Sequence, residues 1–338
     1  MAREHLTVSA GDLRKSLSDV LNRAAQAGET TLITRHGASI AALVPITVYE
    51  ALCRPKETPM SMQPATRLCM ANIAGGAGKT FLTLSIGAAL ARQGYRVAVL
   101  DMDAQASATK WVGLHDDRSS PGLDPERTAG VVFRVDEPSD AILPDPIRVQ
   151  DFDLWPANDG IIRDVAPNIT ADSFRMGNLR EALRKREMDY DFILIDTQPG
   201  RSADLPAAVV AADHVLVPVC DVKGLENLQK LVTLIKGGRA YAPNLQLRMF
   251  IPNKYQAHRR MSRRELELLQ GYESVAVIAP PVRLGDLARS IQEDHRSIFD
   301  IDPKAGITQD IVELAHFIVK TFRPLQQPVG AASQEVAG

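Results

Sequence analysis

The chain has 338 residues, 45% of them hydrophobic, which is enough for an ordinary globular core in one large or two smaller domains. Its formal net charge of −2 excludes an attraction of the whole molecule to nucleic acid, so any such binding must come from local patches. The longest apolar stretch, residues 206–220, is interrupted by Asp213 and His214 and is too short and too polar to span a bilayer.

The cysteines and the first residues of the chain indicate the compartment. Cys53, Cys69 and Cys220 are scattered and lack metal-ligand spacing, which is typical of free thiols in a reducing compartment. Residues 1–5 show no signal-peptide pattern. We therefore expect a soluble, cytoplasmic protein.

The first fifty or so residues predict a small α+β unit with the order strand–helix–hairpin–helix. The predicted strands and helices cover residues 6–9, 13–28, 30–34, 40–44 and 48–53. A unit of this size buries little surface alone, so we expect it to dimerise. It would span residues 1–53 and precede a proline-rich linker over residues 54–66.

This unit resembles the DNA-binding half of the Phd/YefM antitoxin family over residues 7–17, 21–22, 31–37 and 41–44. In that family a dimer presents basic residues to operator DNA, so the resemblance implies DNA contacts by Arg14, Lys15 and Arg35. Arginine suits both phosphates and guanine edges. The alternative is a dimerisation domain with ordinary surface charges. The toxin-binding tail of the family is absent, so toxin neutralisation is not implied.

A glycine-rich turn follows a predicted strand at residues 67–71 and precedes a predicted helix at residues 82–92. Such a turn points backbone N–H groups at an anion, and the helix dipole adds partial positive charge. Lys79 would reach the β- and γ-phosphates, and the Thr80 hydroxyl would bind Mg²⁺. The strict pattern needs a glycine where the chain has Ile73, so a chance Gly-Lys-Thr turn is the alternative.

Two later apolar runs end at carboxylates. Residues 97–100 are followed by Asp101 and Asp103, and residues 192–195 are followed by Asp196. Because the carboxyl ends of parallel strands line the ligand crevice, these three carboxylates are expected to converge on the phosphate loop. There they would hold Mg²⁺ or orient an attacking water. A lone aspartate after a strand is otherwise an ordinary turn or capping residue.

The remaining chain alternates apolar strands with helical patterns, which predicts a mostly parallel α/β sheet. The predicted strands are residues 67–71, 97–100, 152–156, 192–195, 214–219, 247–252 and 275–278. We expect this second domain to cover residues 67–324 and a flexible tail to cover residues 325–338.

Four pieces of the second domain resemble the ParA/Soj/MinD family of partition and positioning ATPases. They are residues 72–80 (NIAGGAGKT), 100–105 (LDMDAQ) with Thr109 behind, 190–199 (YDFILIDTQP) and 215–219 (VLVPV). The resemblance implies a P-loop fold that binds ATP and Mg²⁺ and hydrolyses ATP.

The same resemblance assigns roles to residues. The phosphate loop would be Gly75, Gly76, Ala77, Gly78, Lys79, Thr80 and Phe81. Asp103 would orient the hydrolytic water, with Asp101 and Asp196 supporting the metal. Asn253 would contact the adenine, and residues 280–283 (PPVR), with Pro281, resemble a later nucleotide-side loop.

One position departs from the family. The family's loop carries a second lysine where this chain has Ala74, and that lysine reaches the partner's nucleotide in the ATP-bound dimer. A cation placed against developing phosphate charge is worth several kcal/mol. We therefore expect weak hydrolysis unless another residue replaces it. Arg163 and Arg175 are candidates, and two ordinary surface arginines are the alternative.

Residues 258–264 (HRRMSRR) concentrate the four arginines Arg259, Arg260, Arg263 and Arg264. If helical, arginines four apart share a face and would bind DNA phosphates without sequence preference. A solvated helix face, with Glu265 and Glu267 offsetting the charge, is an equal alternative.

These patterns together favour a ParA-type ATPase for partition of a plasmid or other cargo. It would form an ATP-dependent homodimer, bind nucleoid DNA and a ParB-like partner, and repress its own operon through the first domain. A nucleotide-gated repressor with little hydrolysis is the alternative. A MinD-like membrane role would need a basic amphipathic C-terminal helix, and residues 326–338 contain no Lys or Arg.

Overall fold

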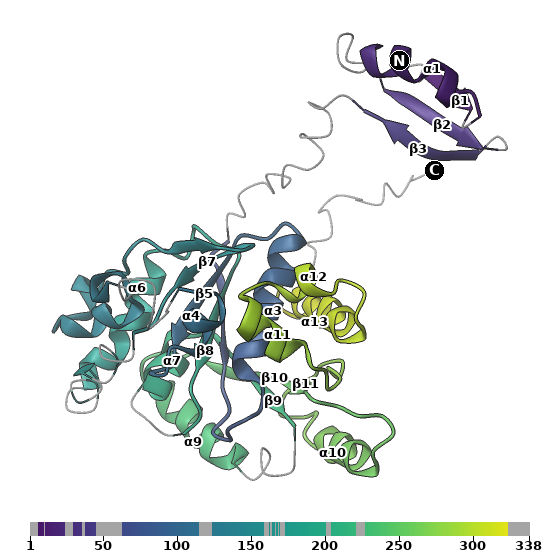
Figure 1. The fold of residues 1–338 in the computed structure, drawn as a ribbon. Helices are drawn as coiled ribbons and strands as arrows, with labels where there is room; N and C mark the ends of the chain where they lie inside the picture. Colours follow the sequence, from purple (N-terminus) through teal and green to yellow (C-terminus); the bar gives the residue numbers. More distant parts are fainter. Residues whose placement is uncertain are drawn as a thin grey trace, which may run out of the picture. The chain divides into compact units, whose positions relative to one another are not determined.

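The computed structural model describes residues 6–9, 11–23, 30–35, 38–44, 63–114, 124–158, 162, 164–165, 167, 169, 173–200, 204–220 and 227–323. The chain divides into two compact units, Met1–Met60 and Ser61–Gly338 (Figure 1). Each unit is described by itself below.

The smaller unit is one helix and a three-stranded sheet. Its elements are β1 (Leu6–Ser9), α1 (Leu13–Asn22), β2 (Thr31–Arg35) and β3 (Ala38–Leu43). The sheet order is β1-β2-β3, with β1 parallel and β3 antiparallel to β2. The predicted order of strand, helix and hairpin is therefore confirmed. The turn at residues 36–37, the end of the predicted first helix beyond residue 23 and the predicted helix at residues 48–53 lie outside the described residues.

The smaller unit has little core of its own within its described residues. Val20 and Thr31 are its buried side chains there. In contrast, Leu17, Leu21 and Ile40 are 43%, 49% and 57% exposed. Apolar side chains on both the helix and the sheet are thus left in contact with water in one copy of the chain.

The larger unit is built on an eight-stranded sheet of order β11-β10-β9-β4-β8-β5-β7-β6. Its strands are β4 (Thr66–Met70), β5 (Val97–Met102), β6 (Ile147–Val149), β7 (Phe152–Trp155), β8 (Phe192–Thr197), β9 (His214–Val219), β10 (Gln246–Pro252) and β11 (Val277–Ile278). All pairings are parallel except that of β6 with β7. The predicted, mostly parallel α/β sheet is confirmed. The seven predicted strands are all present with ends shifted by at most two residues, and β6 is additional.

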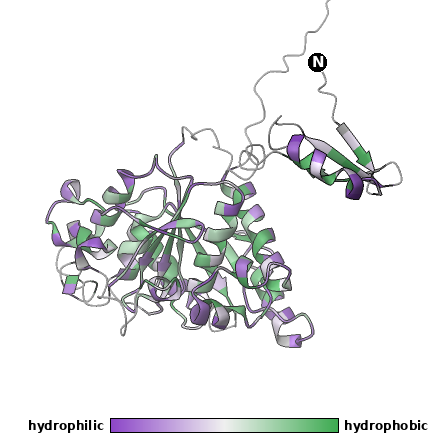
Figure 2. Cartoon of the chain, turned by 45° about the horizontal axis from the view of Figure 1, so that its top comes forward, coloured by the Kyte–Doolittle hydropathy of each residue, from purple (hydrophilic) through white to green (hydrophobic). Residues whose placement is uncertain are grey.

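Helices cover both faces of this sheet, because side chains alternate between the faces along each strand. In β5, Val97 and Val99 pack on the face shared with α3 and α13, whereas Ala98 and Leu100 pack on the face shared with α6, α7 and α9. Figure 2 shows hydrophobic strands at the centre and hydrophilic helix faces outside. The helices are α3 (Lys79–Arg92), α4 (Ser107–Trp111), α6 (Asn178–Arg184), α7 (Asp204–Ala211), α9 (Leu228–Gly238), α10 (Arg260–Gln270), α11 (Leu287–Asp294), α12 (Ile298–Ile301) and α13 (Gly306–Phe322).

Short 3-10 turns complete the segment between β5 and α6, and they are η2 (Pro125–Arg127), η3 (Ala129–Arg134), η4 (Pro138–Asp140) and η5 (Ser173–Gly177). No helix that the structure describes has the length and apolar character needed to cross a lipid bilayer.

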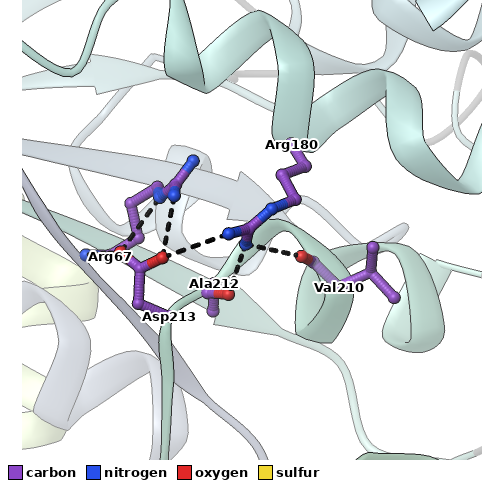
Figure 3. Close-up of polar contacts among 5 residues, drawn as sticks. All are labelled: Arg67, Arg180, Val210, Ala212 and Asp213. Carbon is purple, nitrogen blue, oxygen red and sulfur yellow. Dashed lines mark hydrogen bonds and ion pairs between the residues drawn. The ribbon is translucent and has the colours of Figure 1, made fainter. Parts of the chain in front are cut away.

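An ion-pair network joins the start of β4 to the start of β9 (Figure 3). The Arg67 guanidinium donates to both carboxylate oxygens of Asp213, at 2.7 and 3.1 Å. Arg180, on α6, donates to the carbonyls of Val210 and Ala212 at the end of α7, at 3.1 and 2.8 Å. The network thereby anchors the amino ends of two central strands. The phosphate loop lies at the opposite, carboxyl ends of the strands.

Candidate nucleotide site

The glycine-rich turn links β4 to α3, as expected of a phosphate loop. Gly76 and Gly78 have left-handed φ angles of 74° and 82°, which side chains rarely tolerate. The φ of Gly78 lets α3 begin at Lys79, three residues before the predicted start at Leu82. This geometry does not require a glycine at position 73, where the strict pattern has one and this chain has isoleucine. The loop therefore leads directly into the N-terminus of a 14-residue helix, where an anion is favoured.

Side-chain amides on both sides hold this loop. The Asn72 amide donates to the Pro218 carbonyl at 2.7 Å and accepts from the Ala74 N–H at 2.9 Å. The Asn253 amide donates to the Ala77 carbonyl at 2.8 Å. The predicted contact of Asn253 with the adenine stays a prediction, whereas its role in anchoring the loop is not evident from the sequence.

Lys79 is 6% exposed and donates to the Asn72 carbonyl at 3.2 Å. Burial lowers the pKa of its ammonium, while the charges of Asp196 and Asp103 act in the opposite direction. The lysine thus rests on the loop backbone beside two carboxylates, within reach of an anion held by the loop.

Asp196 is the last residue but one of β8 and lies in register between Asp101 of β5 and Met70 of β4. Its carboxylate is fully buried, accepts from the Thr83 hydroxyl at 3.3 Å and is hydrogen-bonded to Thr80. Burial, followed by the charge of Asp101, raises the pKa of Asp196 to about 8. Its Oδ2 atom has no hydrogen-bond partner among the described residues.

These features of Asp196 fit a divalent cation. A buried carboxylate oxygen without a donor is costly unless a cation satisfies it. The Thr80 hydroxyl is hydrogen-bonded to the same carboxylate, so Thr80 and Asp196 together provide hard oxygen ligands of the kind that Mg²⁺ prefers. The predicted metal role of these two residues agrees with this geometry and stays a prediction.

Asp101 is also fully buried, but its carboxylate faces its own turn. It accepts from the N–H of Asp103 at 3.0 Å and from the N–H and hydroxyl of Thr109 at 2.8 and 2.7 Å. Burial raises its pKa to about 6, while the Thr109 hydrogen bonds lower it. Asp101 therefore positions the turn that carries Asp103, and its direct part in metal binding or catalysis stays a prediction.

Asp101 and Asp196 are register partners on adjacent strands, and the charge of Asp103 acts on both of them. Their convergence on a bound phosphate stays a prediction. Within the described residues, no three carboxylate, thiol or imidazole groups come together as a metal-ligand group. Thr109 holds the carboxylate of Asp101, and Asp103 accepts from the Gln105 N–H and from the Ser107 hydroxyl, both at 2.7 Å.

The loop borders a cavity of about 300 Å³. Its wall brings together most of the predicted nucleotide residues with others that sequence reasoning missed. The predicted ones are Gly76, Ala77, Gly78, Lys79, Thr80, Phe81, Asp103 and Asn253. The additional ones include Ser107, Trp111, Thr197, Lys254, Arg283 and Leu284. Gly75, Asp101, Asp196 and Pro281 are outside this wall, and Arg283 is the residue of the PPVR segment that reaches it.

The predicted DNA-binding residues are exposed, and none of them lines the cavity. Arg14 and Lys15 on α1 and Arg35 at the end of β2 are exposed. Arg259 precedes α10 as its N-cap, and Arg260, Arg263 and Arg264 are exposed in its first turns.

Of the two candidate substitutes for the missing lysine, Arg163 lies outside the described residues. Arg175 is paired with Asp136 and donates to the Phe133 carbonyl at 3.1 Å. Its guanidinium is thus engaged within its own chain, which counts against a role at a partner's nucleotide.

The sheet order, the glycine loop at the carboxyl end of β4 and the adjoining carboxylates define a P-loop nucleotide-binding protein of the mostly parallel α/β class. An AAA domain family model matches residues 65–247, and a model described as antitoxin Phd_YefM, type II toxin-antitoxin system, matches residues 6–67. The chain belongs to the AAA domain family, as a ParA/Soj/MinD-type member with an N-terminal Phd/YefM domain. Both resemblances seen in the sequence are thereby confirmed.

Curated relatives include a probable plasmid-partitioning protein ParA of Thermus thermophilus, 36% identical over 222 residues, which are 62% of this chain and 64% of the relative. The sporulation initiation inhibitor protein Soj of Bacillus subtilis is 30% identical over 173 residues, or 50% of this chain and 64% of that protein. The chain thus spans less than two thirds of the length of either relative.

Solved structures share the fold. Cobyrinic acid a,c-diamide synthase from Mycobacterium smegmatis, with a bound ATP analogue and magnesium, is 26% identical with a TM-score of 0.60, covering 76% of this chain and 95% of that one. The McdA(D38A)–ATP complex from Cyanothece has a TM-score of 0.63 at 18% identity, covering 79% of this chain and all of that one, which shows the fold alone.

Proposed function

We propose that this chain binds Mg-ATP, hydrolyses it and partitions a plasmid or another cargo. The observation that carries this proposal is the shared cavity of the glycine loop, Lys79, Thr80 and Asp103, with the orphaned carboxylate oxygen of Asp196 behind it. The similarity to partitioning proteins ParA and Soj supports the cellular role.

In this proposal, different residues bind the phosphates, bind the metal and orient the attacking water. The loop N–H groups and Lys79 would hold the phosphates, and Thr80 and Asp196 would hold magnesium, which would neutralise charge on the phosphate oxygens. Asp103, fixed by Ser107, orients the attacking water. The water oxygen bonds to the γ-phosphorus, the bond to the β–γ bridging oxygen breaks, and ADP, inorganic phosphate and a proton leave.

Two surfaces support DNA binding. The first turns of α10 carry Arg260, Arg263 and Arg264 and no acidic residue in the first turn, although a helix N-terminus prefers negative charge. These arginines make no ion pair with any residue in the described ranges. We propose that they bind phosphates of nucleoid DNA. The exposed basic residues of the smaller unit would contact operator DNA and repress the operon.

The smaller unit would act as a homodimer, because Leu17, Leu21 and Ile40 are exposed in one copy. ATP would join the larger units in a second pairing, and a ParB-like protein would stimulate hydrolysis. In this scheme the two domains are residues 1–53 and 67–324, with a linker between them, and the protein is cytoplasmic and associated with the nucleoid.

Calorimetry with Mg-ATP, combined with plasmid retention in cells, tests the proposal. The wild type should bind Mg-ATP, and Lys79→Ala should abolish both binding and retention. Folded wild-type protein that gives no heat with Mg-ATP would overturn the enzyme proposal. Normal plasmid retention with Lys79→Ala would overturn the partition role.

Ala74 favours a second candidate, a nucleotide-gated repressor with little hydrolysis, because the loop lacks the family's second lysine. Steady-state ATPase assays with DNA and a partner protein separate the two. Turnover stimulated by DNA or partner rejects the repressor, whereas tight ATP binding with operator release and no turnover supports it.

A further inference from the structure

Three cationic side chains line the nucleotide cavity, namely Lys79, Lys254 and Arg283. Two of them have hydrogen-bond or ion-pair partners within the protein. Lys79 donates to the Asn72 carbonyl, and the Arg283 guanidinium forms a fork on Asp310 at 2.7 and 2.8 Å. The exposed Lys254 ammonium makes no hydrogen bond or ion pair with any residue that the structure describes. Among these three cations, Lys254 is therefore the one whose ammonium has no partner within the part of the chain that the structure describes.

The backbone of Lys254 is in a conformation that disfavours a side chain. Its φ is 57°, in the left-handed region that glycine and asparagine occupy more readily. Its neighbours are held there, because the Asn253 N–H donates to the Val219 carbonyl at 2.8 Å and the Tyr255 N–H donates to the Val282 carbonyl at 3.0 Å. A lysine at a position suited to glycine is more readily explained by a use for its ammonium than by folding.

We propose that Lys254 is a nucleotide-binding residue that contacts an anionic phosphate oxygen of the bound nucleotide. This inference rests on the proposed function, because it takes the cavity ligand to be a nucleoside phosphate. Asn253 joins the loop at Ala77 to the end of β10, and Lys254, which follows it, lines the same cavity as the phosphate loop. Unlike a lysine supplied by a second subunit, Lys254 provides this charge within one chain.

The test compares Lys254→Gly, Lys254→Asn and Lys254→Arg with the wild type. Glycine and asparagine both accept the left-handed φ, so neither should impair folding, and glycine should leave the thermal midpoint unchanged or raised. The matched control is Lys236→Ala, an exposed lysine on α9 outside the cavity wall. Calorimetry at constant salt gives the Kd for Mg-ATP, Mg-ADP and adenosine.

We expect Lys254→Gly and Lys254→Asn to bind Mg-ATP and Mg-ADP about tenfold more weakly, with adenosine affinity unchanged, because these variants lack one charge-assisted hydrogen bond to phosphate. Lys254→Arg should stay near the wild type, and Lys236→Ala should equal it. Wild-type affinity in both neutral variants, or an equal loss for adenosine, overturns the proposal. If the wild type itself binds no nucleotide, the proposed function fails instead.

Discussion

Gly78 and Asn253 lie so close that a Cβ atom added to the glycine would be 2.4 Å from the amide nitrogen of Asn253. The same nitrogen donates to the Ala77 carbonyl at 2.8 Å. The phosphate loop and the end of β10 are thus joined at a point where only hydrogen fits on the loop residue.

Gly78→Ala should therefore damage the loop through both the close approach and the left-handed φ of 82°. We expect a loss of stability of about 1–2 kcal/mol and at least a tenfold weaker affinity for Mg-ATP. Thermal unfolding and calorimetry measure the two effects. Gly237→Ala is the matched control, because a Cβ there meets nothing within 4 Å. Equal behaviour of the two variants would contradict the role assigned to Gly78.

Ser107 should act on catalysis through Asp103, whose Oδ2 atom accepts its hydroxyl at 2.7 Å. Ser107→Ala removes one of the two hydrogen bonds that hold the carboxylate and leaves that from the Gln105 N–H, so we expect kcat for ATP to fall about tenfold with little change in KM. Ser107→Thr keeps the hydroxyl and should restore part of the rate. Steady-state kinetics measure this. A rise in KM with unchanged kcat would instead indicate that Ser107 contacts the substrate.

Asp213 should make stability depend on pH. Burial alone would raise its pKa, but the hydrogen bonds and charge of Arg67 bring it below its ordinary value (Figure 3). A carboxyl with a lowered folded pKa stabilises the fold above its unfolded pKa of about 4, and this contribution is lost as the pH falls through the folded value. We expect Asp213→Asn to cost about 1–3 kcal/mol at neutral pH, and the difference from wild type to shrink below about pH 4.

Urea unfolding at several pH values measures this difference for Asp213→Asn. Asp189→Asn is the control, because Asp189 is 51% exposed in its pair with Arg186 and should contribute little. If the loss of unfolding free energy in Asp213→Asn persists unchanged at acid pH, Asp213 stabilises the fold through its packing rather than through its charge.

The arginines of α10 should determine the salt dependence of nonspecific DNA binding. Replacing Arg260, Arg263 and Arg264 by alanine should weaken binding and flatten the slope of log K against log salt by about 0.9 for each phosphate that is no longer neutralised. Fluorescence anisotropy over a salt series measures the slope. Arg184→Ala removes an exposed arginine already paired with Glu181 and should leave the slope unchanged. An unaltered slope in the triple variant would favour a solvated helix face.

Much of the fold could be predicted from local pattern, because buried parallel strands are continuous apolar runs. The exceptions have physical causes. β5 continues through Asp101 to Met102, because Thr109 satisfies a carboxylate that the sequence alone would place after the strand. β6 was not predicted, because it has only three residues and the exposed Arg148 interrupts its apolar pattern.

The site residues that are contiguous in the sequence could be predicted, whereas those that come from distant segments of the chain could not. Residues 76–81 follow a recognisable spacing, and the cavity wall contains them. Lys254 and Arg283 reach that wall only through the pairing of β10 with its neighbours and the bridge between Tyr255 and Arg283. The carboxylate of Asp101 accepts from the hydroxyl of Thr109, eight residues away, and the carboxylate pattern in the sequence did not reveal this contact.

The two tryptophans occupy contrasting surroundings. Trp111 is on the cavity wall at the end of α4, whereas Trp155 is 0% exposed in β7. A molecule that enters the cavity alters the environment of one indole and leaves the other in the core. The protein therefore contains its own optical reporter, and its intrinsic emission can follow ligand entry without any added label.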